Sequence, residues 1–212
     1  MAKNNEVRSL ILEKAYNLFL LNNFEKVTIS KLEKSSEKIR GTIFYYFSNK
    51  QELFEAVVDE FFFPSLSLPN EVSEIAVSSS FQSFIKIYIN PEDRIINNIK
   101  SRYHIKDANM SCYNFIIQAW QYYNNFQEKY REIIIKDATV WNYAIRKAQD
   151  TNEISRDVKV DLSALFIFMS SGVTFRNCFD TESATDQSIQ SIKLYNLLKK
   201  KIKSIVNIHT SF

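Results

Sequence analysis

The sequence predicts an all-α protein, and three observations on its 212 residues support this fold class. Only 2 glycines and 3 prolines occur, so the chain has little material for hairpins and tight turns. Long stretches rich in Leu, Ile, Lys, Glu, Asn and Gln repeat their apolar residues with the period of an α-helix rather than the alternation of a strand. Because 45% of the residues are hydrophobic, the chain can bury a full core. We expect one small and one larger helical domain.

The first helix is expected at residues 5–22. Its apolar residues recur at helical spacing and form one stripe: Val7, Ile11, Ala15, Leu18 and Phe19. Such a stripe is buried against neighbouring helices. We expect it to pack on the two short helices that follow, which gives a three-helix head.

Two short helices are expected at residues 28–34 and 39–47, joined by a tight turn. Thr28 is a suitable N-cap for the first helix, and Ile29 and Leu32 are spaced to face inward. One side of the second helix carries Ile43, Phe44 and Phe47. The opposite side carries Arg40, Thr42, Tyr45 and Tyr46. This layout is typical of a helix-turn-helix DNA-binding segment.

The rest of the chain also shows helical periodicity. A helix is expected at residues 51–63, and Pro64 and Pro69 mark the first interruption after it. Further helices are expected at residues 71–89, 91–103, 110–125, 127–149, 161–180 and 186–208. Pro91, Asp161 and Asp186 are well placed near helix starts. No repeat, low-complexity tract or flexible linker divides this region, so we expect one domain after the head.

The most specific motif is GTIFYYFSNKQEL at residues 41–53. It follows Asn23-Phe24, Val27-Thr28-Ile29 and Leu32-Glu33 at suitable distances. In these motifs, their order and their distance from the N-terminus, the chain resembles the tetracycline-repressor (TetR) family of bacterial transcription regulators. The resemblance implies a helix-turn-helix DNA-binding domain at residues 1–50 and a helical effector-binding and dimerisation domain at residues 51–212.

Several residues depart from the family pattern. Glu37 stands where the turn usually has a glycine at positive φ, a conformation that costs glutamate about 1 kcal/mol or more. We call the two short helices at residues 28–34 and 39–47 the first and second reader helices. Lys38 and Ile39 replace an aliphatic residue and a serine N-cap, so the second reader helix is expected to lack its usual cap. Glu33 replaces a small buried alanine, and Phe44 stands where tyrosine is usual.

The resemblance and the side-chain chemistry together select candidate DNA contacts. Arg40 suits guanine edges or phosphate, Thr42 suits a thymine methyl group, and Gly41 leaves room for close backbone approach. The remaining candidates resemble the family's phosphate contacts or lie at the start of the first reader helix: Tyr45, Tyr46, Lys50, Thr28 and Ser30. The alternative for the two tyrosines is ordinary packing, and for the lysine a solvated surface position.

Positive charge is concentrated in the same region. Residues 1–53 contain nine lysines and arginines against six glutamates, an excess that equals the net charge of +3 of the entire chain. Phosphate groups attract such an excess, although a solvated surface of mixed charge explains it equally well.

The larger domain contains candidates for an effector pocket and for a dimer interface. Aromatic residues in the middle of the chain are candidates for binding a small apolar or aromatic effector, with plain core packing as the alternative: Tyr113, Trp120, Tyr123 and Trp141. The resemblance implies that the last two long helices pair with those of a second subunit. The candidates there are Leu165, Met169, Gly172, Leu194, Leu198 and Ile202, for which a monomer core is the alternative.

Other classes of protein fit the sequence less well. Glycine-rich phosphate loops, nucleophile motifs and metal-ligand spacings are missing, and His104 and His209 are isolated, so we expect no enzyme, no metal and no cofactor. Cys112 and Cys178 are too few for a disulfide scaffold, and the N-terminus does not read as a secretory signal. The apolar run at residues 162–175 is too short to span a bilayer. We expect a cytoplasmic protein.

These observations predict a regulator, most simply a repressor, that binds a palindromic operator in double-stranded DNA as a homodimer and is released by a small molecule. The alternative is a helical ligand-binding or interaction protein whose DNA binding is degraded, because Glu33, Glu37 and the missing cap all depart from the usual reader.

Overall fold

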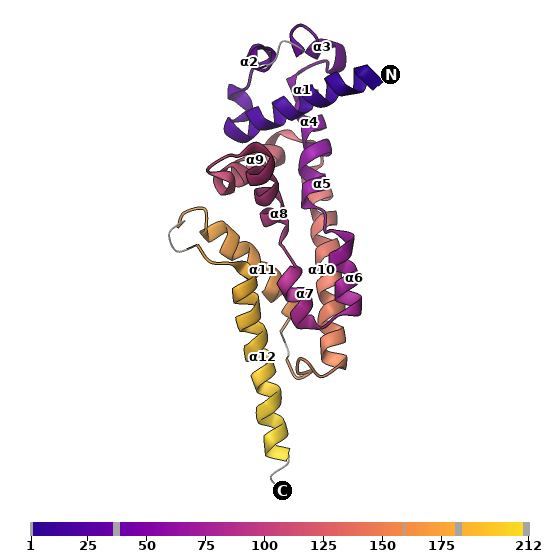
Figure 1. The fold of residues 1–212 in the computed structure, drawn as a ribbon, viewed down its shortest axis with the longest axis vertical. Coiled ribbons are helices and arrows are strands. Elements are labelled where there is room, and N and C mark those ends of the chain that lie inside the picture. Colours follow the sequence, from indigo (N-terminus) through magenta and orange to yellow (C-terminus); the bar gives the residue numbers. More distant parts are fainter. Residues whose placement is uncertain (1, 36–38, 159, 181–183, 210–212) are drawn as a thin grey trace. The chain divides into compact units, whose positions relative to one another are not determined.

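The structure is a computed structural model that describes residues 2–35, 39–158, 160–180 and 184–209, with side chains for residues 5–35, 39–158, 160–180 and 184–199. The described part of the chain is helical and contains no strand (Figure 1), as the sequence predicts. It forms two compact units, Met1–Ser67 with Arg94–Arg131 and Leu68–Asp93 with Glu132–Phe212. These units reflect packing, and the functional division expected at residue 50 stays a prediction.

The first unit contains the N-terminal head. Its elements are α1 (Ala2–Leu21), a 3-10 turn (Phe24–Lys26), α2 (Ile29–Lys34), α3 (Ile43–Tyr46), α4 (Lys50–Val57), a π-helical turn (Val58–Phe62), α5 (Phe63–Leu66), a second π-helical turn (Ile99–Tyr103) and α9 (Ala108–Tyr122). The ends of two helices complete it, from α8 (Pro91–Asn98) and α10 (Phe126–Asp150).

Aromatic side chains hold α1, α4 and α9 together. The rings of Tyr16 and Phe115 meet edge to face with centroids 5.1 Å apart, and those of Phe19 and Phe54 do so at 4.9 Å. All four side chains are fully buried. Burial raises the pKa of the Tyr16 phenol far above its usual range, so this hydroxyl stays neutral. Aromatic pairs of this geometry contribute roughly 0.5–1.5 kcal/mol beyond the burial of their area, so the head is anchored firmly within its unit.

The second unit consists of α6 (Asn70–Ser78), α7 (Phe81–Ile87), the start of α8, most of α10, α11 (Leu162–Arg176) and α12 (Gln187–His209). Its core is centred on Trp141, which stacks on Phe166 at 4.9 Å and meets Phe84 edge to face at 4.8 Å. α11 and α12 run alongside each other (Figure 1). Asp161 caps α11 by accepting a hydrogen bond from the Ala164 amide at 3.0 Å, which confirms its predicted place at a helix start.

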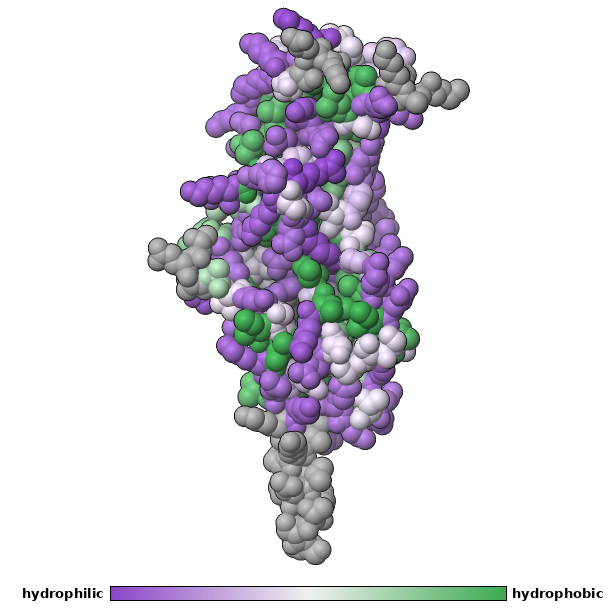
Figure 2. Space-filling model, viewed as in Figure 1, coloured by the Kyte–Doolittle hydropathy of each residue, from purple (hydrophilic) through white to green (hydrophobic). Residues whose placement is uncertain are grey.

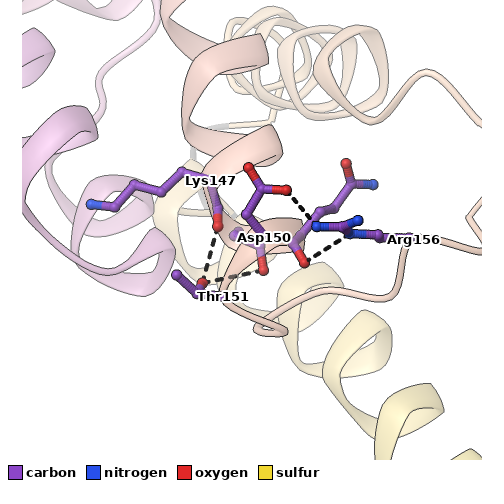
Figure 3. A network of polar contacts seen from close by, with 6 residues as sticks. Lys147, Asp150, Thr151 and Arg156 are labelled. Atoms are coloured by element: carbon purple, nitrogen blue, oxygen red, sulfur yellow. Dashed lines mark hydrogen bonds and ion pairs between the residues drawn. The ribbon is translucent and has the colours of Figure 1, made fainter.

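A small polar network ends α10 (Figure 3). The Thr151 hydroxyl donates to the Lys147 carbonyl at 3.0 Å, and the Arg156 guanidinium contacts the Asp150 carboxylate at 2.6 Å. Asn152 adopts a left-handed φ of 58°, which asparagine tolerates. These contacts satisfy the last helical carbonyls and turn the chain towards α11.

Two expected boundaries are wrong. The helical run that begins with α4 continues through the π-helical turn and α5 to Leu66, so it does not end before Pro64. Pro64 lies in the first turn of α5, where its missing N–H is not needed. The helix expected at residues 71–89 is two helices, because the Ser80 hydroxyl caps α7 by accepting from the Ser83 amide at 3.2 Å. None of the described helices combines the length and the apolar character needed to cross a membrane.

Candidate nucleic-acid interface

The first reader helix, α2, begins as the sequence predicts. The Thr28 hydroxyl oxygen accepts a hydrogen bond from the Lys31 amide at 3.2 Å, which makes Thr28 the N-cap. Leu32 is buried on the inner side, whereas Thr28 and Ser30 are exposed. Both hydroxyl side chains are therefore accessible to an external partner.

The second reader helix is much shorter than expected. Residues 39–47 were predicted to be helical, but α3 contains only Ile43–Tyr46. Gly41 precedes it with a φ of +69°, a left-handed conformation that glycine adopts without strain. Thr42 stands at the N-cap position without a side-chain capping bond, and its hydroxyl donates to the Ile39 carbonyl at 2.9 Å. The missing cap was predicted for a helix that begins near Ile39, whereas α3 begins at Ile43 and also lacks a side-chain cap.

Glu33 has a role in this turn that the sequence did not reveal. Its carboxylate accepts a hydrogen bond from the Gly41 amide at 3.0 Å and so ties α2 to the residue that starts the reader turn. Charge-assisted hydrogen bonds to backbone amides are among the stronger ones. Glu33 departs from the family pattern, but it supplies the acceptor for the Gly41 amide just before α3. Glu37 and Lys38 lie outside the described residues.

The reader turn is anchored on one side and open on the other. Ile39, Ile43 and Phe47 are buried. Tyr45 is 75% exposed and Phe44 is 64% exposed. Phe44 was expected on the inner face, and that expectation is wrong, because Ile43 and Phe47 occupy the inner side and Phe44, one residue after Ile43, points away from it.

The outward face combines several kinds of chemistry. Arg40 and Gly41 are exposed, and Thr42 and Tyr46 are half-buried. The rings of Tyr45 and Tyr46 meet edge to face at 4.9 Å. An exposed guanidinium, an exposed phenol and an exposed apolar ring thus lie within one short, anchored segment. Such a face can donate hydrogen bonds to base edges and phosphates and can pack on apolar groups.

Lys50 lies at the start of α4, close to the 3-10 turn. Its ammonium group donates to the Phe24 carbonyl at 3.0 Å and lies 4.1 Å from the centroid of the Phe24 ring. It is half-buried. The predicted phosphate contact of Lys50 stays a prediction, and the structure adds an internal contact to it.

The start of α4 is capped from two sides. The Asn49 side chain accepts from the Glu52 amide at 2.9 Å, and the Glu52 carboxylate accepts from the Ser48 amide at 2.7 Å. The hydrogen bond from the Ser48 amide holds the pKa of Glu52 below its ordinary value. This reciprocal arrangement fixes the angle at which the chain leaves the reader.

The four predicted effector residues do not line one cavity. Trp120 lines a groove between α9 and α10. Tyr123 is buried and donates to the Asp59 carboxylate at 2.6 Å, Tyr113 is half-buried on α9, and Trp141 belongs to the core of the second unit. Their role in binding an effector stays a prediction.

The predicted dimer residues fall into two groups. Leu165 and Gly172 are exposed on α11. Met169, Leu194 and Leu198 are half-buried against the core of the second unit, and the side chain of Ile202 lies outside the described residues. The apolar pattern also marked Phe168, Ile189 and Leu197, which are exposed, but sequence reasoning missed the exposed Phe175 near the end of α11 and Phe179 just after it. Leu165, Phe168, Gly172, Phe175 and Phe179 recur every three or four residues, and this spacing was the available signal.

Comparison with known proteins agrees with this arrangement. Residues 11–57 match the family described as bacterial regulatory proteins, tetR family. Among solved structures, the chain is similar to E. coli NemR in its reduced form, with a TM-score of 0.60 and 11% identity over 91% of this chain and 97% of that one. It is also similar to a TetR-family transcriptional regulator from Cytophaga hutchinsonii, with a TM-score of 0.58 and 14% identity over 96% of both chains. The fatty acid degradation regulator FadR from Bacillus halodurans follows, with a TM-score of 0.55 and 12% identity over 90% of this chain and 97% of that one. At these identities the likeness shows a shared fold. No curated protein matches this chain.

Proposed function

Because residues 11–57 match the tetR family of bacterial regulatory proteins and the chain shares the fold of TetR-family regulators, we propose that it is a regulator of this kind, which binds a palindromic operator as a homodimer and represses transcription until a small molecule releases it. The observation that carries the proposal is the outward face at Arg40, Phe44 and Tyr45, held in place by the buried Ile39 and Ile43. A short segment anchored on one side and open on the other is what entry into a major groove requires.

Each exposed group suits a different part of DNA. The Arg40 guanidinium matches the two acceptors on a guanine edge, and Thr42 and Phe44 offer apolar contact to thymine methyl groups. The phenols of Tyr45 and Tyr46, with Thr28, Ser30 and Lys50, suit phosphate oxygens. Phosphate contacts set position and affinity, and contacts to base edges set sequence preference.

An exposed apolar stripe on α11 supports the homodimer. Phe168 is 74% exposed, and Leu165, Gly172 and Phe175 extend the stripe along α11. Phe179, which is 70% exposed, follows in the turn just after the helix ends at Arg176. Figure 2 shows hydrophobic residues at the surface in the part of the view where α11 and α12 lie. Apolar side chains at such spacing form the seam of paired helices, and large exposed apolar patches mark interfaces.

A two-fold dimer explains how a ligand would act. Two readers must lie roughly 34–36 Å apart, or a multiple of that distance, to enter successive major grooves on one face of DNA. A ligand that changes this separation changes affinity, and near-complete release needs a difference of about 5.5 kcal/mol between its binding to the two states.

The test is a fluorescence anisotropy titration of the full chain against labelled DNA from upstream of its own gene, with random duplex as competitor. We expect preference for the upstream duplex and a steep loss of affinity with salt. Arg40→Ala should weaken the preferred site by about 1–3 kcal/mol and leave random duplex nearly unchanged. Lys50→Ala should weaken all duplexes alike.

The exposed Lys136 on α10 gives a control that removes the same charge outside the head, and Lys136→Ala should leave DNA binding unchanged. Because Lys50 also contacts Phe24, urea unfolding of Lys50→Ala must accompany its titration. If wild-type protein shows no preference over random duplex, the proposal fails and a ligand-binding protein without DNA recognition replaces it.

A further inference from the structure

An open groove lies where α9 meets α10, within the first unit. Its volume is about 460 Å³, in the range of small-molecule sites. α9 contributes Ile117 and Trp120, and α10 contributes Phe126, Tyr130 and Arg131. Ile117 and Trp120 are each 58% exposed and lie together in this groove, so they form an apolar patch rather than scattered single residues.

The lining indicates the chemistry of an occupant. Trp120, Phe126 and Tyr130 offer aromatic surface on both helices. Arg131 is the one charged residue among the described lining residues, and it is exposed at the edge of α10. A guanidinium beside aromatic walls suits a flat aromatic ring that carries a carboxylate, with the ring against Trp120 and the carboxylate on Arg131.

The C-terminal end of α9 contacts the head directly. The ring of Tyr122, two residues after Trp120, stacks on Phe24 with centroids 4.2 Å apart, and its hydroxyl donates to the Glu25 carboxylate at 2.9 Å. The Lys50 ammonium in turn donates to the Phe24 carbonyl and lies over the Phe24 ring. The Gln51 amide also donates to the Tyr122 carbonyl. One turn of α9 therefore touches both the 3-10 turn before α2 and the first residues of α4.

Polar contacts also fix the connection between the end of α9 at Tyr122 and the start of α10 at Phe126. The Asp59 carboxylate accepts hydrogen bonds from the Tyr123 hydroxyl at 2.6 Å and from the Lys129 ammonium at 2.8 Å. The hydrogen bonds of Lys129 with Asp59 and Tyr123 raise its pKa above its usual range. Asn125 lies in this connection, with a left-handed φ of 60°. A ring inserted between α9 and α10 would therefore act on the end of α9 that holds Tyr122 against the head.

We propose that the groove between α9 and α10 binds an aromatic carboxylate, and that its occupancy lowers DNA affinity through the stack of Tyr122 on Phe24 and the contact of Phe24 with Lys50. The regulatory half of this inference rests on the proposed function. The binding half does not, because it concerns the free protein.

Naphthoate serves as the probe, and equilibrium dialysis without DNA tests the binding half. Wild-type protein should bind naphthoate saturably and with quenching of Trp120 fluorescence, since the other tryptophan, Trp141, is buried. Trp120→Ala and Ile117→Glu should abolish binding. Arg131→Gln should weaken naphthoate about fivefold, as expected for an exposed charge, and leave the neutral analogue naphthamide unaffected.

Anisotropy titrations with operator DNA test the regulatory half. Saturating naphthoate should lower DNA affinity at least fivefold, the lower end of typical coupling between sites. Tyr122→Ala should still bind naphthoate but lose this effect. Tyr122→Phe keeps the ring and should keep the effect, which separates the stack from the hydrogen bond to Glu25.

Four outcomes would overturn the inference or its regulatory half. Naphthoate that does not bind saturably, or that binds Trp120→Ala as well as wild type, excludes the site. Sedimentation in which Ile117→Glu separates associated copies identifies the groove as a contact between copies instead. If wild type binds DNA but naphthoate leaves its affinity unchanged, the coupling is wrong. Protein that binds naphthoate but no DNA contradicts both the coupling and the proposed function, while the binding site stands.

Discussion

At the scale of single residues, Gly41 and Glu33 stabilise the turn that leads into α3. Gly41 adopts the left-handed backbone conformation, and the Glu33 carboxylate accepts its amide hydrogen. Ile39 and Ile43 bury the inner side. Backbone conformation, charge and burial thus act together within a few residues.

Gly41→Ala is expected to destabilise the protein by about 1–2 kcal/mol, because a Cβ disfavours the left-handed region. The cost is conformational, since a Cβ at this position meets no atom within 4 Å. Gly41→Asn should cost less, because asparagine tolerates this region. Urea unfolding measures both, and equal losses for Ala and Asn would show that the strain is elsewhere.

Glu33→Ala is expected to cost roughly 0.5–1.5 kcal/mol of unfolding free energy by leaving the Gly41 amide without its acceptor. DNA affinity should fall for all sequences alike, because the turn as a whole loosens. Glu33→Gln keeps an acceptor oxygen and should retain most of both quantities. If Glu33→Ala has the same DNA affinity and the same unfolding free energy as wild type, the Glu33 carboxylate does not stabilise the turn.

At the scale of elements, capping decides where helices begin. Ser80 splits one expected helix into α6 and α7, Thr28 starts α2, and Asp161 starts α11. α4 carries the most complete cap, with Asn49 and Glu52 each accepting a backbone amide. Because α4 leaves directly from the reader, this cap sets the orientation of the reader within its unit.

The cap on α4 predicts a dependence on pH. The hydrogen bond from the Ser48 amide lowers the pKa of Glu52 in the folded protein. A lowered folded pKa means that the stabilisation is present above the unfolded pKa, roughly 4.3, and is lost as pH falls through the folded value. Wild type should be more stable than Glu52→Gln at neutral pH, and the two should converge below about pH 4. Urea unfolding at both pH values tests this, and a constant difference would contradict it.

At the scale of the whole molecule, the exposed apolar stripe on α11 is typical of a surface that binds another subunit. Phe168, Phe175 and Phe179 present apolar rings to solvent in the single chain. A second copy would bury them, and two-fold symmetry would make the same stripe serve both subunits. The homodimer and paired DNA reading then depend on the same surface.

Phe168→Glu is therefore expected to convert a dimer into a monomer and to weaken operator binding, because single readers lose the contribution of the second half-site. Val77→Glu, which places the same charge on another exposed apolar residue of the second unit, should remain dimeric. Sedimentation velocity distinguishes these results. If Phe168→Glu remains dimeric, the dimer interface does not include this face of α11.

The sequence by itself determined the helical class, the approximate extent of α1, α9, α10, α11 and α12, and the Thr28 and Asp161 caps, because periodicity and capping are local properties. It also determined which residues suit DNA, since that follows from side-chain chemistry. Only the tertiary structure decided that α3 has four residues, that Phe44 faces outward and that Glu33 holds Gly41. It also decided that α9 and α10 enclose a groove and that Tyr122 stacks on Phe24, because such contacts depend on how the elements pack in three dimensions, which no local pattern encodes.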